Sequence, residues 1–266
     1  MGAVAVDRAN ILGCYIDRLD MDQTLERCDE MIRGSRGVQH VAVNAAKLVA
    51  LQDDAELRAI VDSCELVSAD GQSVVWASRL LGDPLPERVA GIDLMQRLLD
   101  LAERRGYGVF ILGARPDVLE RAVDELRRLH PELRIDGYHH GYFADDESAA
   151  IAGTVRESEA EILLVAMSSP RKEYWLARFG RETGVPFIMG VGGAIDVVAG
   201  VARRAPLWMQ RAGLEWLFRF VQEPRRMGRR YLVTNTRFAA LLAREVYRRR
   251  VRGSEPEPQR HYWKGH

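Results

Sequence analysis

The sequence contains only three cysteines among its 266 residues, Cys14, Cys28 and Cys64, with no C-x-x-C pair and no histidine at ligand spacing. This spacing excludes a disulfide framework and a cysteine-based zinc site, and it indicates buried free thiols in a reducing compartment. No segment offers about 18 uncharged apolar residues, and the N-terminal segment lacks the charged and apolar blocks of a signal peptide. We therefore expect a cytoplasmic protein without a membrane span.

Signatures of dinucleotide and metal binding are also absent from the sequence. There is no G-x-G-x-x-G in the first βαβ unit and no Walker A sequence. His139 and His140 are adjacent, so on a strand they would point to opposite faces and make a poor chelate. The acid pairs at 53–54 and 145–146 are typical of polar turns or helix starts rather than of a D-x-D metal site. We expect neither a metal nor a cofactor.

The net charge of zero hides two blocks of opposite charge. Residues 201–252 contain fourteen arginines against three glutamates, so this segment carries +11 and the remainder of the chain carries −11. Tryptophan, leucine and other apolar residues recur through the basic segment at helical spacing, which is typical of amphipathic helices with basic faces. A helical cap with a solvated arginine face is the plain alternative. The interpretation that we favour is an anionic partner.

Short apolar runs alternate with segments of helical periodicity in the rest of the chain. The runs predicted to be buried strands are 38–43, 64–69, 107–112, 133–138, 161–167 and 186–192. This alternation predicts an α/β fold with a mainly parallel sheet and helices on both faces. We divide the chain into a core (1–202), a basic helical appendage (203–252) and a polar, Pro-rich, disordered tail (253–266).

Distinctive residues follow the predicted strands, at the sheet edge where ligands of such folds bind. Asn44 follows the first core strand, and Asp70 and Gly71 follow the second. Gly192 and Gly193 follow the last strand, in a turn that opens a helix and whose backbone N–H groups could receive a phosphate. The glycine turn is a weak indication by itself, because Gly-Gly is often only a tight connection.

Several motifs occur in order between about residues 38 and 232: "VNAAKLV", "SADGQSVVWASRLLG", "RVAGIDLM", "GYHHGYF", "SSPRKEYW", "GVGGAIDVVAG" and "RRAPLWMQRAGLEWLFRFVQEPRR". Together they resemble the WecG/TagA/CpsF family, glycosyltransferase family 26. The resemblance implies a Rossmann-like core and an inverting, metal-independent hexosyltransferase. It implies a UDP-sugar donor, of the N-acetylmannosamine type or a hexuronate, and a polyprenyl-diphosphate-linked saccharide acceptor.

The resemblance also implies a place for the protein in the cell. Members of the family are similar peripheral proteins of cell-wall and cell-surface polysaccharide synthesis, whose basic appendage meets an anionic membrane at its cytoplasmic face. A homo-oligomer is compatible with this interpretation. The alternatives are a non-catalytic, nucleotide-binding membrane protein, which has no use for Asp70 or Asn44, and a dinucleotide-dependent oxidoreductase, which needs the missing glycine fingerprint. Nucleic-acid binding is not expected, because the arginines are interleaved with Trp and Leu.

Carried over residue by residue, the resemblance implies specific roles. Asp70 would be the general base on the acceptor hydroxyl, and Arg88 would neutralise the leaving diphosphate. Asn44 would bind the donor sugar or ribose, Tyr142 would stack on uracil, and Asp196 would accept hydrogen bonds from the nucleotide. In the appendage, three arginines match family positions that reach toward the active site; these are Arg219, Arg226 and Arg229.

Plain structural roles are the alternatives for the same side chains. Asp70 could cap the helix that follows it, and Arg88 could pair with Glu87 or Asp93. Asn44 could be a helix N-cap. The tyrosine could be an ordinary core aromatic, and the aspartate of "GGAID" could be a charge in the first turn of a helix.

Two positions in the predicted sugar pocket depart from the family pattern. Ala42 stands where related sequences usually carry Thr, and Lys172 stands where they carry Gln. We interpret the pair as altered donor specificity, for example for a donor with a carboxylate that Lys172 could pair. Impaired activity is the alternative.

Overall fold

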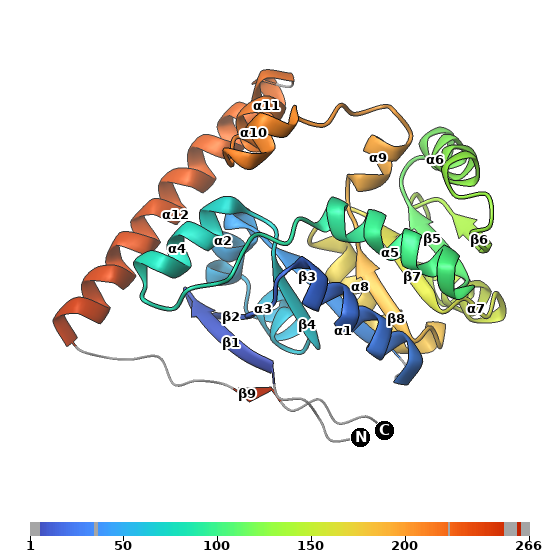
Figure 1. Ribbon diagram of the computed structural model, residues 1–266, viewed down its shortest axis with the longest axis horizontal. Helices are drawn as coiled ribbons and strands as arrows, with labels where there is room; N and C mark the ends of the chain where they lie inside the picture. The colour runs from blue at the N-terminus through green and yellow to red at the C-terminus, as the bar shows by residue number, and fades with distance from the viewer. Residues whose placement is uncertain (1–5, 35–36, 223, 253–259, 262–266) are drawn as a thin grey trace.

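The computed structural model of the protein describes residues 6–34, 37–222, 224–252 and 260–261. Its centre is a six-stranded sheet in the order β4-β3-β8-β7-β5-β6, and every ladder in it is parallel (Figure 1). The strands are β3 (Val38–Val43), β4 (Leu66–Ala69), β5 (Val109–Gly113), β6 (Ile135–His139), β7 (Ile162–Ala166) and β8 (Phe187–Gly190). Every predicted strand is found, so the predicted α/β fold is confirmed.

Helices cover both faces of this sheet because its strands are apolar on both faces. Along β7, Ile162 and Leu164 belong to one apolar cluster, whereas Leu163 and Val165 belong to another, as the period of two in a strand requires. The first face is covered by α1 (Met21–Gly34), α5 (Gly91–Arg105), α6 (Pro116–Leu129) and α9 (Ala194–Val198). The second is covered by α2 (Ala45–Asp53), α3 (Ala55–Asp62), α7 (Ser148–Glu157) and α8 (Arg171–Phe179).

An antiparallel hairpin of β1 (Val6–Ile11) and β2 (Cys14–Asp17) stands beside the main sheet. A buried ion pair fastens it there: Arg8 Nε lies 2.8 Å from Asp17 Oδ1, and the other carboxylate oxygen accepts from the Val67 N–H of β4 at 2.6 Å. All three cysteines are buried and free, as predicted. Burial raises the pKa of the Cys14 thiol to about 12, which leaves it protonated and inert.

Part of the C-terminal tail contacts the same hairpin. We expected disorder over residues 253–266, yet residues 260–261 form the short strand β9 (Arg260–His261), which pairs antiparallel with β1. The free backbone groups on that edge of β1 explain the pairing. The remaining residues of the tail lie outside the described residues.

The predicted appendage consists of α10 (Leu207–Arg211), α11 (Glu215–Gln222) and α12 (Pro224–Arg252). Figure 1 shows α12 running along one side of the molecule, with α10 and α11 beside its N-terminal end. Phe238 of α12 is buried in the apolar cluster formed by β1, α2 and α4 (Gln72–Leu80), and Leu241, Leu242 and Val246 pack against the same cluster. This half of α12 is therefore part of the core packing.

Two further contacts fix the appendage on the core. Arg249 of α12 donates to the carbonyl oxygens of Leu81 at 2.9 Å and of Asn10 at 2.8 Å. Gly213, between α10 and α11, has φ +71°, and a Cβ there would lie 2.8 Å from the Gln72 side chain of α4. Only glycine allows this close approach. None of the helices in the described part of the chain combines the length and apolar character that a membrane span requires.

Candidate active site

Asp70 lies at the carboxyl edge of the sheet, directly after β4. Its N–H donates to the Val43 carbonyl of β3 at 2.9 Å, so the ends of the two strands are held together. Its Oδ1 accepts from the Gly91 N–H, the first residue of α5, at 2.9 Å. The alternative that Asp70 caps the next helix is wrong, because α4 has Gly71 as N-cap and no side-chain cap there. The carboxylate instead contacts the N-terminal end of α5.

The second oxygen of this carboxylate is the chemically available one. Asp70 is half-buried, and among the described residues no donor bonds its Oδ2. Ala42, one of the two departures from the family pattern, lies beside it: a Cβ on Gly91 would be 3.7 Å from the Ala42 Cβ and 4.0 Å from Asp70 Oδ1. The structure therefore brings Ala42 of β3 and Asp70, which follows β4, together.

Asn44 lies next to Asp70 and has a structural role of its own. It is the N-cap of α2, and its Oδ1 accepts from the Lys47 N–H at 3.0 Å. The N-cap alternative is thus confirmed for this residue. A Cβ on Gly71 would lie 3.5 Å from the Asn44 Cβ, which places the cap against the loop that carries Asp70. Since the cap uses only the carbonyl oxygen, the amide nitrogen of Asn44 is a donor that the cap does not occupy.

Lys172 lies at the start of α8, and its side chain reaches the end of β8 at the carboxyl edge of the sheet. Its side chain crosses Gly190, where a Cβ would lie 2.7 Å from the lysine Cε. Its Nζ lies 3.6 Å from Glu173 Oε1, the oxygen that also binds the Lys47 ammonium. Burial lowers the pKa of Lys172, and the charge of Lys47 lowers it further, while Glu173 and Asp70 favour the charged form. Asp70 and Lys172 are thus electrostatic neighbours.

Arg88 takes part in an ion-pair network between the core and the appendage. Its guanidinium pairs with Glu215 of α11 rather than with either acid considered above. Arg204 binds Asp93 of α5 through two bonds of 2.6 and 2.7 Å and lies 3.5 Å from Glu215. The neighbouring Glu87 accepts from a backbone N–H of α1 instead. Arg88 pairs with Glu215 because α11 places the Glu215 carboxylate against the loop that carries Arg88.

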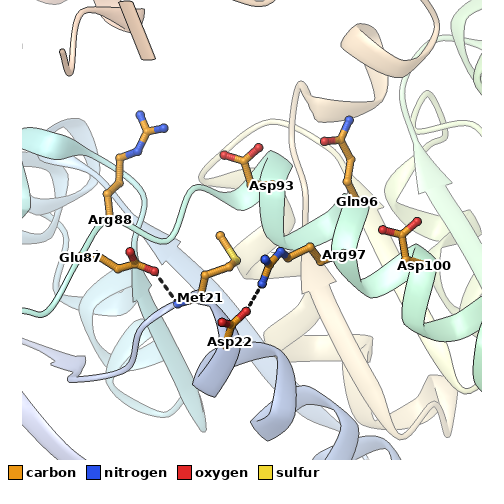
Figure 2. Close-up of a pocket in the computed structure, with 8 residues that line it drawn as sticks. All are labelled: Met21, Asp22, Glu87, Arg88, Asp93, Gln96, Arg97 and Asp100. Atoms are coloured by element: carbon orange, nitrogen blue, oxygen red, sulfur yellow. Dashed lines mark hydrogen bonds and ion pairs between the residues drawn. The ribbon is translucent and has the colours of Figure 1, made fainter. Parts of the chain in front are cut away.

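A cavity of about 590 Å³ opens beside α1 and α5, with Arg88 on its rim (Figure 2). Four of its lining residues are acids: Asp22, Glu87, Asp93 and Asp100. Figure 2 shows the Arg88 guanidinium pointing away from the ion pair between Asp22 and Arg97 in the floor of the cavity. Two of these acids are paired with arginines, Asp22 with Arg97 and Asp93 with Arg204, so the lining combines both signs of charge.

Tyr142 follows β6, the edge strand on the side of the sheet opposite β4. Its side chain is 66% exposed, so the alternative of an ordinary core aromatic is wrong. Arg171 holds the turn that carries it, donating to the Gly141 carbonyl at 3.1 Å and to the Phe143 carbonyl at 2.9 Å. The ring is therefore presented to solvent on a fixed turn. The distance between β6 and β3 is about 19 Å at the usual strand spacing, because three strands lie between them: β8, β7 and β5.

The glycine turn lies after β8, as predicted for a phosphate site, but the carboxylate of Asp196 lies beside it. Gly192 has φ +51°, and a Cβ on Gly193 would lie 3.3 Å from Asp196 Oδ2. Asp196 stands in the first turn of α9, as its structural alternative predicts. Its nucleotide role stays a prediction.

The three arginines predicted in the appendage belong to α11 and α12. The side chains of Arg219, Arg226 and Arg229 lie outside the described residues.

Several charged residues of this region were not identified from the sequence. Lys47 and Glu173 lie inside the quoted motifs. The feature of the sequence that could have identified them is a charged residue on a helix face that is otherwise apolar. Arg204 and Glu215 lie in a segment whose many charges conceal the two that pair with the core.

The architecture defines a Rossmann-like α/β protein whose carboxylate, amide and ammonium groups gather where the parallel strands end. Residues 9–252 match the family model "Glycosyl transferase WecG/TagA/CpsF family". The chain therefore belongs to this family of glycosyltransferases, and the predicted resemblance is confirmed. The match extends from β1 to the end of α12, so the appendage is part of the family architecture. Such a family acts on a sugar donor and an acceptor rather than on a redox substrate.

Proposed function

We propose that the protein is an inverting, metal-independent hexosyltransferase with Asp70 as general base. Its donor is a UDP-sugar, and its acceptor is the hydroxyl of a polyprenyl-diphosphate-linked saccharide in cell-surface polysaccharide synthesis. The observation that carries the proposal is the asymmetry of the Asp70 carboxylate. One oxygen is fixed by the Gly91 N–H at 2.9 Å, and the other has no donor among the described residues.

This arrangement suits a single displacement at the anomeric carbon. Asp70 Oδ2 takes the proton of the acceptor hydroxyl while the hydroxyl oxygen forms the new bond to C1 of the donor sugar. The bond from C1 to the diphosphate oxygen breaks on the opposite face, and UDP leaves with the electron pair. Inversion at C1 follows because only one displacement occurs.

Arg88 is the cation that we assign to the leaving diphosphate. In the structure it is paired with Glu215, so it must change partners when the donor binds. Arg204 makes that exchange feasible, because it lies 3.5 Å from the same glutamate and keeps it paired with a cation. At the nucleotide end, we assign the exposed Tyr142 ring to stacking on uracil.

Titration calorimetry with UDP in excess chelator tests the donor class. We expect binding without divalent metal, and we expect Tyr142→Ala to weaken it about 5-fold to 100-fold, the usual worth of stacking on one base. Tyr138→Ala is the matched control, since Tyr138 lies on β6 and is 43% exposed. Absence of any binding heat or thermal shift in the wild type would overturn the proposal, and equal losses in both variants would remove Tyr142 from it.

The exposed face of the appendage supports a peripheral position at the inner face of the cell membrane. Leu207 and Trp208 of α10 are 68% and 65% exposed, and Trp216 and Val221 of α11 are 43% and 68% exposed. These apolar side chains stand in a segment of charge +11. Each basic residue near an anionic surface contributes about 1 kcal/mol before screening, and the apolar side chains would enter the interface.

Vesicle sedimentation tests this position on the full chain, because truncation would expose the surface that Phe238 covers. We expect binding to anionic vesicles, weaker binding to neutral ones, and loss of binding in a Leu207→Ser, Trp208→Ser double variant. Tyr247→Ser is the matched control, since Tyr247 is 69% exposed at the far end of α12. Binding indifferent to lipid charge and salt would argue against the membrane role.

A further inference from the structure

The turn that carries Tyr142 is held from two sides, by the sheet and by α8. From the sheet, the Ala114 carbonyl after β5 accepts from the Gly141 N–H at 3.0 Å. From α8, the Arg171 guanidinium donates to the Gly141 carbonyl at 3.1 Å and to the Phe143 carbonyl at 2.9 Å. The residues on both sides of Tyr142 are therefore fixed, while the tyrosine side chain itself is 66% exposed.

An arginine suits this place because its planar guanidinium carries several N–H donors in a fixed fork. Its Nη1 bonds the residue before Tyr142, and its Nη2 bonds the residue after it. The guanidinium carbon also lies 5.1 Å from the centre of the Phe143 ring, within the range of a cation–π contact. That ring packs edge-on against Trp175 of α8, with 6.4 Å between the ring centres. Arg171 therefore ties the turn to the helix through both its backbone and its aromatic ring.

The same helix also reaches the strand ends near the proposed base. Lys172, the next residue, lies across Gly190 at the end of β8, whereas Arg171 reaches the turn after β6. A UDP-sugar is one molecule with its base at one end and its sugar at the other. The start of α8 is thus a common support for the two regions that such a donor must contact together.

From this geometry we infer that Arg171 is a positioning residue for nucleotide binding, which holds the Tyr142 ring where it stacks on the base. The inference rests on the proposed function, because it requires that Tyr142 receives the uracil of a UDP donor. An exposed turn that had to be ordered on binding would reduce the affinity for the ligand, and Arg171 removes that cost. In this scheme the guanidinium acts through the ring and does not itself contact the nucleotide.

A double-mutant cycle followed by titration calorimetry with UDP tests this role. Arg171→Met keeps the apolar stem of the side chain and removes all of its N–H donors. We expect it to weaken UDP binding about 3-fold to 30-fold, because only a fraction of the molecules then holds the ring in place. Adding it to Tyr142→Ala should cause no further loss, since the arginine acts only through the ring.

Two further variants separate the position of the turn from the charge. Arg171→Lys keeps the charge but replaces the fork with a single ammonium, so it should restore only part of the affinity that Arg171→Met loses. Gly141→Ala keeps the arginine but places a methyl group 3.0 Å from the Gly113 Cα, so the turn must shift. UDP binding should weaken in this variant although no charge is removed.

Arg178→Met is the matched control. Arg178 lies in the last turn of α8, and its guanidinium carbon lies 5.6 Å from the centre of the Phe179 ring. The variant removes an equal charge and a similar aromatic contact away from the Tyr142 turn, so the affinity for UDP should stay at the wild-type value. Thermal melts check folding, and Arg171→Gln replaces Arg171→Met if that variant does not fold.

The outcomes distinguish this inference from the function on which it rests. If Tyr142→Ala weakens UDP binding but Arg171→Met does not, the inference is wrong and the proposed function stands. Losses that multiply in the double variant would indicate a direct contact between Arg171 and the ligand, and they would also overturn it. If the wild type binds no UDP, the proposed function fails and takes the inference with it.

Discussion

The sheet core and the appendage treat charged and apolar side chains in opposite ways. In the core, apolar residues are covered and charges such as Lys47 and Glu173 are buried beside a predicted ligand site. In the appendage, Trp208 is 65% exposed, and partly buried ion pairs through Glu215 hold α11 to the core. Surface ion pairs contribute little, whereas a buried charge is costly without a partner. Buried charges in the core therefore need specific partners, as Arg8 has in Asp17, whereas the ion pairs of the appendage can exchange partners.

The largest effect is expected at the core site, from Asp70→Asn. Loss of the general base should lower kcat by about 10²-fold to 10⁴-fold. The asparagine oxygen still accepts from the Gly91 N–H, so UDP affinity and melting temperature should change little. The measurements are single-turnover transfer, UDP titration and thermal unfolding, with Asp117→Asn at the exposed start of α6 as control. A variant that turns over at the wild-type rate would remove Asp70 from the mechanism.

Phe238→Ala tests whether the C-terminal half of α12 belongs to the core rather than to the loosely docked part. The side chain is 7% exposed in the cluster of β1, α2 and α4, so its loss should lower the free energy of unfolding by about 3–5 kcal/mol. Leu232→Ala, at a residue of the same helix that is 68% exposed, should change it by about 0.5 kcal/mol or less. Urea unfolding measures both, and equal effects would contradict the division.

His40 gives the stability of the core a dependence on pH. Its pKa falls from 6.5 to about 3 on folding, so between these values the unfolded chain binds a proton that the folded chain does not. The free energy of unfolding should therefore fall as pH drops through this range, by about 1.4 kcal/mol per pH unit. Urea unfolding at pH 7, 6, 5 and 4 measures the slope. We expect His40→Gln to have a shallower slope, and an unchanged slope would assign it to other groups.

The smallest effect is expected from Glu215→Gln, which breaks the network between α11 and the core. Its partners are partly exposed, with Arg88 and Arg204 side chains 14% and 21% accessible, so the free energy of unfolding should fall by about 1 kcal/mol or less. The loss should shrink further in high salt. Because Arg88 is released, UDP affinity should rise or stay the same. A loss as large as that of Phe238→Ala would show that the network is structural.

The sequence was sufficient for features that depend on local pattern. Apolar runs between helical segments predicted each strand of the six-stranded sheet, and the rule that parallel strands end at one edge predicted that Asn44 and Asp70 would lie together. It was insufficient where the partner is remote. Glu173 is 126 residues from Lys47, and Glu215 is 127 residues from Arg88. Helical periodicity likewise could not tell which apolar residues of α12 would be covered, because the face that packs is chosen by the core.

The hydrogen bond from Arg249 to the Asn10 carbonyl has a consequence for folding during synthesis. The two residues are 239 positions apart. At about 5–20 residues per second, synthesis of the intervening chain takes roughly 10 to 50 seconds. During that interval the N-terminal hairpin exists without the helix that covers it, since Phe238 is also made late. The hairpin is thus synthesised well before the helix that covers it, and its apolar surface is not covered by α12 until then.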